Sequence, residues 1–185
     1  MDVESFDKLS AMAMGTHRRK PEVVQIMRAL AVKHSDYGDI EKALSYVARA
    51  EKLADELLQT KEHAQVLLVW LTKVEILLKK LRLGTEEEFK EPIEIARAAK
   101  DLARKIYGEK TFITNQTMLT YAMTLTKVKG MEEESRLWFD KAEQLFEVIN
   151  NEISFKEGCN LLFNMLLHYN FMLNDFSTTV DTQKR

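Results

Sequence analysis

The sequence has few of the residues that form covalent cross-links and tight turns. Its 185 residues include one cysteine, Cys159, two prolines and six glycines. One cysteine cannot form an internal disulfide, and Cys159 has no neighbouring Cys or His at metal-ligand spacing. So little glycine and proline argues against turn-rich β structure. We therefore expect a helical chain that holds no metal and no cofactor.

An excess of charge of one sign is also missing. The chain has 27 Lys and Arg against 29 Asp and Glu, a net charge of −2, so no basic excess points to nucleic acid. The most apolar run, residues 64–83, is interrupted by lysines and a glutamate and is too charged to span a bilayer. The opening MDVESFDKL lacks the apolar core of a signal peptide. We expect no membrane insertion and a cytoplasmic or nuclear location.

Catalytic motifs are a third absence. The sequence contains no glycine-rich phosphate loop, no H-E-x-x-H and no G-x-S-x-G. The four histidines are scattered, and Cys159 stands beside apolar Leu161 and Leu162, as a small buried residue would. The basic cluster 17–20 suits a solvated loop better than a nuclear address or a phosphate contact. We expect a protein that is not an enzyme.

What the sequence does contain is a repeat. The segment YGDIEKALSYVARA, residues 37–50, ends one helix at Gly38 and starts another. The same pattern returns at Gly84 and Gly130, at intervals of 46 residues, and at Asn174, 44 residues further on. Because Asn tolerates the left-handed conformation that Gly supplies, all four residues can share one turn role.

The residues around each anchor repeat as well. An alanine stands twelve residues after each glycine, at positions 50, 96 and 142. A bulky apolar residue stands nine after it, at positions 47, 93 and 139. Small residues let two helices approach closely, and bulky residues fill the space between neighbouring units. The pattern therefore predicts stacked helix pairs.

The expected helices follow from these positions. First helices are predicted at about 21–37, 61–83, 111–129 and 152–173, and second helices at about 39–58, 86–107 and 131–150. The second helix of the middle pair begins either near residue 86 or at Pro92, after a looser turn. The predicted organisation is an N-terminal cap with a basic loop, three units and a partial fourth: 1–20, 21–60, 61–109, 110–150 and 151–185.

The segment Gly-Asp-Ile-x-x-Ala-Leu-x-x-Val-x-x-Ala at 38–50 resembles the turn and second helix of a tetratricopeptide repeat. The Ile-Tyr-Gly-Glu segment at 106–109 is similar to the link between the longer repeats of kinesin light chains. The resemblance implies an all-α fold, a right-handed α-solenoid of antiparallel helix pairs with about three and a half repeats. HEAT-like repeats have a similar period and remain the alternative.

The resemblance also implies a concave groove lined by the first helix of each pair. The residues expected to bind a partner there are Arg28, Glu75, Thr120, Tyr121, Thr124, Lys127, Asn164 and His168. The third unit offers hydroxyls, one aromatic ring and one cation, which suit an extended peptide. Val32 and Thr124 stand where a carboxylate-binding asparagine would be expected, so that type of clamp is not predicted. The apolar groove positions bind a partner helix or pack against neighbouring helices.

The predicted function is an adaptor or scaffold that binds a peptide or helix of a partner protein. Two alternatives remain open. One is a self-assembly module that pairs through an apolar face in the last helix, formed by Phe163, Leu166, Leu167 and Phe171. The other is a regulatory domain of a larger complex or enzyme.

Overall fold

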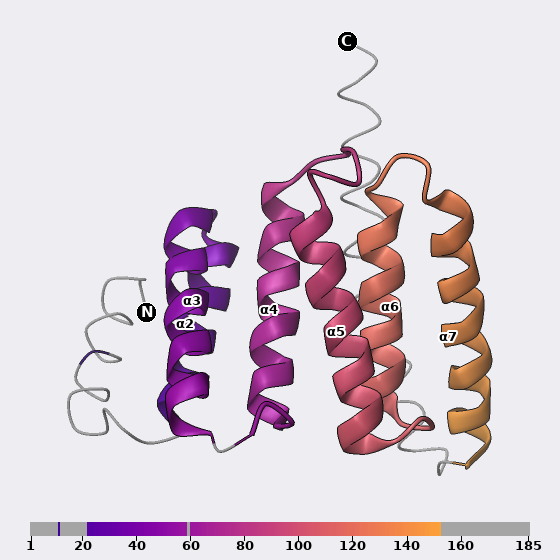
Figure 1. Cartoon of the computed structure of the whole chain (residues 1–185), viewed down its shortest axis with the longest axis horizontal. Coiled ribbons are helices and arrows are strands. Elements are labelled where there is room, and N and C mark those ends of the chain that lie inside the picture. Colours follow the sequence, from indigo (N-terminus) through magenta and orange to yellow (C-terminus); the bar gives the residue numbers. More distant parts are fainter. Residues whose placement is uncertain (1–10, 12–21, 59, 153–185) are drawn as a thin grey trace.

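A computed structural model of the chain describes residue 11 and residues 22–58 and 60–152. Described residues form six α-helices, and Figure 1 shows them in chain order from left to right, with α2 and α3 overlapping in this view. They are α2 (Glu22–Asp36), α3 (Ile40–Leu57), α4 (Ala64–Lys80), α5 (Lys90–Tyr107), α6 (Phe112–Thr126) and α7 (Glu132–Glu152). The described part contains no strand, and its β pairing is an isolated bridge between Gly84 and Val128. The all-α prediction is confirmed for these residues.

The observed helices fall within or close to the predicted ranges. The helix α4 is shorter than predicted at both ends. It begins at Ala64, because the His63 side chain caps it by accepting a hydrogen bond from the Gln65 N–H, and it ends before Leu81, whose backbone is extended. Residues 86–89 form a hydrogen-bonded turn, so α5 begins at Lys90, between the two predicted starts. Pro92 then lies in the first helical turn, where its missing N–H costs no hydrogen bond.

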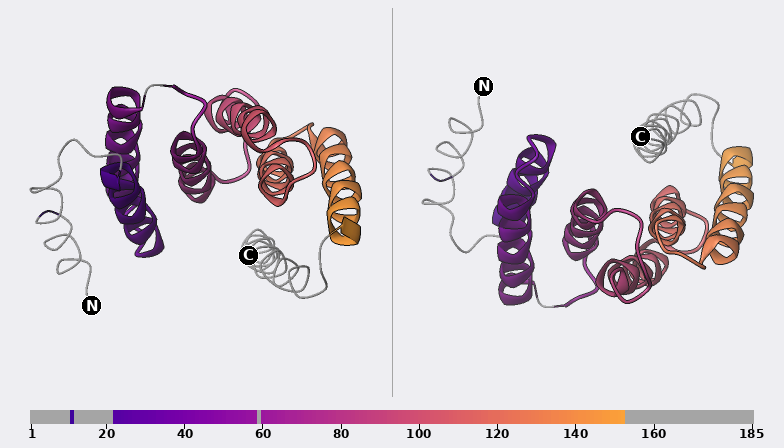
Figure 2. Two further views of the ribbon diagram at one scale, coloured as in Figure 1. Left: turned by 90° about the horizontal axis from the view of Figure 1, so that it is seen from below. Right: turned by 90° about the horizontal axis from the view of Figure 1, so that it is seen from above.

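The helices are arranged in two layers. Each helix packs against the next one along the chain, and α4 also contacts both α2 and α6. Both views in Figure 2 place α4 and α6 on one side and α5 on the other. Because short connections join neighbours that pack side by side, consecutive helices run antiparallel. This alternation is consistent with a helical repeat.

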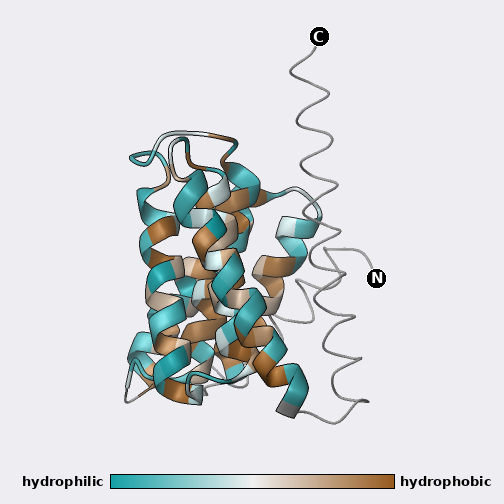
Figure 3. Cartoon of the chain, turned by 90° about the vertical axis from the view of Figure 1, so that its right-hand side faces the viewer, coloured by the Kyte–Doolittle hydropathy of each residue, from teal (hydrophilic) through white to brown (hydrophobic). Residues whose placement is uncertain are grey.

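Small residues hold the paired helices close together. Ala50, Ala96 and Ala142 are each 0% exposed, which confirms the role predicted for the alanine after each glycine. At the bulky position, Val47 and Ile93 are buried but Phe139 is only half-buried. Figure 3 shows hydrophobic and hydrophilic turns alternating along the helices, as expected where one face of each helix packs inward.

The shared turn role predicted for the glycines is wrong at Gly84. Gly38 and Gly130 have φ values of 82° and 87°, but Gly84 is not in the left-handed region, whereas Gly108, which caps α5, is (φ 88°). Gly84 is required for space instead, because a Cβ there would lie 3.0 Å from Cε2 of the buried Phe89 ring. Its backbone pairs with the loop after α6: Gly84 N–H donates to the Lys127 carbonyl (3.0 Å), and Lys129 N–H donates to the Gly84 carbonyl (2.9 Å).

Candidate functional site

The predicted groove residues on α2 and α4 reach the surface in part. Glu75 is exposed, and Arg28 is half-buried. The Nε atom of Arg28 is buried and has no hydrogen-bond partner. Asn164 and His168, together with the apolar face predicted in the last helix, the basic cluster 17–20, Cys159 and Asn174, lie outside the described residues. Their predicted roles stay predictions.

The two threonines predicted to line the groove on α6, Thr120 and Thr124, point into the protein, as does Thr117 one turn before them. Thr117, Thr120 and Thr124 are at most 4% exposed. Their hydroxyls donate to carbonyls of their own helix, at residues 114, 116 and 120, over 2.8–3.0 Å. Thr120 and Thr124 therefore do not present free donors to a peptide, because backbone carbonyls already accept their hydrogens. Beyond its first turn, the partly exposed side chains of α6 follow a different stripe: Gln116, Leu119, Met123 and Thr126.

Tyr121 is also buried, at 2% exposure, and belongs to the core between α4, α5 and α6. Its hydroxyl accepts a hydrogen bond from Arg97 Nη2 on α5 (3.2 Å) and donates to Glu134 Oε1 on α7 (3.2 Å). Its ring meets Trp138 of α7 edge-on, with centroids 5.5 Å apart. The expected partner-binding aromatic is thus a side chain that holds α5, α6 and α7 together.

Cations surround these two rings. Lys100 is 6% exposed, with its Nζ 4.6 Å from the centre of the Trp138 ring and 2.7 Å from Asp101 Oδ1. Lys141 Nζ lies 4.3 Å from the centre of the same Trp138 ring. The sequence analysis missed this cluster. In the sequence, Arg97 and Lys100 on α5 and Lys141 on α7 look like ordinary charged residues on solvent-exposed helix faces.

The cluster shifts the ionisation of its members. Burial raises the pKa of Tyr121, and the nearby Glu134 carboxylate raises it further, although the hydrogen bond from Arg97 acts in the opposite direction. The hydrogen bond to Tyr121 in turn raises the pKa of Arg97. Both shifts favour the protonated forms of the two side chains, in which the Arg97 guanidinium donates to the Tyr121 hydroxyl.

Lys127, the predicted groove cation, connects two helices. Its Nζ donates to the carbonyl of Leu78 on α4 over 3.0 Å. This contact lies beside the bridge between Gly84 and Val128. The ammonium group thus stabilises the packing of α4 on α6, which the sequence pattern did not indicate.

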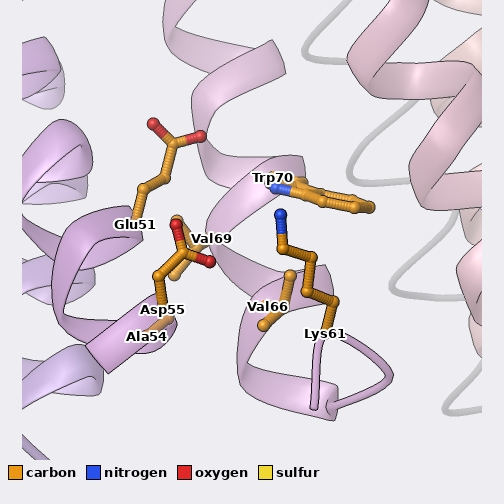
Figure 4. Close-up of a pocket in the computed structure, with 7 residues that line it drawn as sticks. All are labelled: Glu51, Ala54, Asp55, Lys61, Val66, Val69 and Trp70. Carbon is orange, nitrogen blue, oxygen red and sulfur yellow. The ribbon is translucent and has the colours of Figure 1, made fainter. Parts of the chain in front are cut away.

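A small cavity opens between α3 and α4, as Figure 4 shows. Its volume is about 190 Å³, and its lining residues are Glu51, Ala54, Asp55, Lys61, Val66, Val69 and Trp70. Glu51 and Asp55 come from the last turns of α3, Lys61 from the connecting loop, and Trp70 from α4. The floor is apolar, because Ala54, Val66 and Val69 are buried. None of these residues was predicted as a site, since acidic side chains one helical turn apart look like a solvated face.

Charge beside the cavity is partly compensated. Lys73 of α4 lies 3.1 Å from carboxylate oxygens of both Glu51 and Glu91. Burial opposes the charged form of Lys73 most strongly, but the hydrogen bonds and charges of Glu91 and Glu51 together raise its pKa. Asp55 and Lys61 have no ion-pair partner among the described residues. The cavity therefore has the unpaired carboxylate of Asp55 on one wall. The unpaired ammonium of Lys61, at the end of a flexible side chain, lies on another wall.

No group of three His, Cys, Asp or Glu side chains within residues 22–58 and 60–152 is placed to hold a metal ion. In the same part of the chain, no helix combines the length and the apolar character needed to cross a bilayer.

Comparison with known proteins finds no family model that matches the chain and no curated protein that matches it. The resemblance to tetratricopeptide repeats therefore stays a prediction that rests on the residues quoted above.

Proposed function

We propose that the protein is a non-enzymatic adaptor of the tetratricopeptide type. In this proposal the helix pairs continue as a right-handed solenoid of about three and a half repeats. The observation that carries it is the contact of α4 with both α2 and α6, which forms a continuous layer of first helices. Such a layer presents one extended surface, and extended surfaces of stacked helices suit the recognition of a partner peptide or helix.

The binding surface proposed here uses the outward faces of these three helices. Gln25 and Ala29 on α2 and Leu68 and Glu75 on α4 are exposed. On α6 the corresponding stripe is Gln116, Leu119 and Met123, in place of the buried Thr120, Tyr121 and Thr124. This surface mixes amides, one carboxylate and apolar side chains, so a partner segment with both apolar and polar side chains fits it.

The test compares charge substitutions on the first helices of the pairs, α2 and α4, with the same substitutions on the second helices, α3 and α5. The variant Gln25→Lys/Leu68→Lys adds two charges to exposed positions of α2 and α4. The control Ser45→Lys/Ala98→Lys adds the same charges to exposed positions of α3 and α5. All proteins are checked for equal helicity by circular dichroism before they are used as bait in a pull-down.

We expect partner proteins to be captured by the wild type and the control but lost with the α2/α4 variant. Partners retained equally by all three proteins would overturn the assignment of the surface to this layer. Tyr121 is unsuitable for this test, because its replacement would disturb the core and not only the surface.

A further inference from the structure

The cavity between α3 and α4 is too small for a cofactor or a drug-sized ligand. Sites of that kind span about 300–1,000 Å³, whereas this cavity measures about 190 Å³. A space of this size suits a single amino-acid side chain. It lies between the end of α3 and the start of α4, and none of its lining residues belongs to those named above for the surface on α2, α4 and α6.

The chemistry of the walls favours a cation on an apolar stem. The buried side chains of Ala54, Val66 and Val69 offer contact to methylene groups. The indole of Trp70 attracts cations over its face. On and beside the cavity, the carboxylates of Glu51, Asp55 and Glu91 outnumber the ammonium groups of Lys61 and Lys73.

The chain's own Lys61 shows the kind of group that the cavity admits. Figure 4 shows the Lys61 side chain rising from the loop toward the Trp70 indole, across from the Glu51 and Asp55 carboxylates of α3. Lys61 is exposed and has no ion pair in the described part of the chain, so no strong contact holds it there. A lysine is thus already directed into the space by a short loop, and it can leave without breaking a salt bridge.

We propose that this cavity binds the side chain of a lysine or arginine from a partner peptide, and that Lys61 competes for the same position. The incoming ammonium or guanidinium lies against Trp70 and pairs with Asp55, while its methylene groups contact the apolar floor. Lys61 swings into solvent when the partner side chain enters. The proposal does not depend on the binding surface assigned to α2, α4 and α6.

The experiment is a titration of the full chain followed by the NMR signal of the Trp70 indole N–H. The sequence has two tryptophans, so a Trp70→Phe sample assigns the signal and Trp138 serves as an internal reference. The ligand is lysine blocked as its N-acetyl amide. Blocked norleucine, which keeps an apolar stem but lacks the charge, is the matched ligand control, and blocked glutamate tests for an anion site.

We expect saturable movement of the Trp70 signal with blocked lysine and weaker movement with norleucine. Lys61→Gln should tighten lysine binding about 3- to 10-fold, because it removes a tethered competitor. Asp55→Asn should weaken binding about two- to fivefold. Lys52→Gln, on an exposed lysine of α3 that faces Glu56 and does not line the cavity, should leave binding unchanged.

Three results would overturn the proposal. Equal responses to blocked lysine and blocked norleucine would show an apolar contact only. A response to blocked glutamate that Lys61→Gln abolishes would show an anion site. No saturable response in the wild type or in Lys61→Gln would show that the cavity accepts no side chain.

Discussion

The two places where helix pairs meet are joined by different chemistry. We call the contact of α2 and α3 with α4 the first junction, and the contact of α4 and α5 with α6 and α7 the second junction. Both have an apolar core. The polar links of the first are ion pairs: Lys79 to Asp36 (3.2 Å) and Lys80 to Glu41 (2.7 Å) lie at the surface, and Lys73 to Glu51 (3.1 Å) is half-buried. The second adds backbone hydrogen bonds at Gly84 and a buried tyrosine.

This difference separates a closed junction from an open one. Backbone pairing and the cluster around Tyr121 link the helices of the second junction, whereas the first contains a cavity with the unpaired Asp55 carboxylate on its wall. Interior packing supplies most of the stability of a repeat array, and an unfilled space lined by both apolar and charged side chains is where a partner can add contacts. One repeat pattern in the sequence can thus produce two junctions of different construction, and our proposals assign partner binding to the first.

The largest effect is expected from removing the ring at the second junction. Tyr121→Ala should lower the free energy of unfolding by about 3–5 kcal/mol, because it leaves a cavity in the core. Tyr46→Ala, at a half-buried ring stacked on His34 in the first helix pair, should cost about 1–2 kcal/mol. Urea denaturation measures both. Equal costs would contradict the larger contribution assigned to the buried ring of the second junction.

A smaller loss of stability is expected from substitution of Gly84, whose backbone hydrogen bonds link α4 and α6 at the second junction. Gly84→Ala should cost about 1–3 kcal/mol, because its Cβ crowds Phe89 and Glu88. Gly38→Ala should cost about 1–2 kcal/mol for another reason, its positive φ.

Substitution by asparagine distinguishes the two causes, which are lack of space at Gly84 and a left-handed backbone conformation at Gly38. Gly38→Asn should cost less than Gly38→Ala, since Asn tolerates the left-handed region and nothing lies within 4 Å of the added Cβ. Gly84→Asn should cost at least as much as Gly84→Ala. Thermal denaturation of the four variants gives the comparison, and relief by Asn at Gly84 would mean that conformation and not space is limiting there.

The ion pairs of the first junction should contribute less, and only at low salt. Lys79→Gln/Lys80→Gln removes the pairs with Asp36 and Glu41. It should lower the free energy of unfolding by up to about 1 kcal/mol at low ionic strength. In 1 M salt the difference from the wild type should vanish, because the charges are screened within about 3 Å. A difference that persists in high salt would assign these lysines a packing role.

The smallest predicted effect is a pH dependence from Tyr121. Its folded-state pKa is raised above the ordinary value of 10.0. The phenol is therefore protonated more readily in the folded chain than in the unfolded one, and its contribution to stability is complete below pH 10. That contribution is lost as the pH rises through the folded-state pKa. The loss should be absent in Tyr121→Phe, and ultraviolet absorbance should show one fewer late-titrating tyrosine in that variant.

The helices were predictable because each depends on local residues. The alanines at 50, 96 and 142 and the glycines at 38 and 130 have the roles that their spacing indicated. The role of Gly84 could not be read from its spacing, because it depends on a loop that is distant in sequence, around Val128.

The candidate site was predicted less well than the fold. Periodicity identifies a face of a helix but not the neighbour that covers it. The register taken from the resemblance placed Tyr121 and the threonines of α6 outward, whereas α4, α5 and α7 bury them. The cavity combines the end of one helix, a loop and the next helix, so no single sequence pattern contained it.

Amide hydrogen exchange by NMR tests the contrast between the junctions most directly. The N–H groups of Gly84 and Lys129 lie in loops but donate to carbonyls across the second junction. The account predicts that both exchange at least about 100-fold more slowly than the amide of Lys61 in the loop of the first junction, since they open only when the junction opens. Exchange of Gly84 and Lys129 as fast as that of Lys61 would contradict a closed second junction.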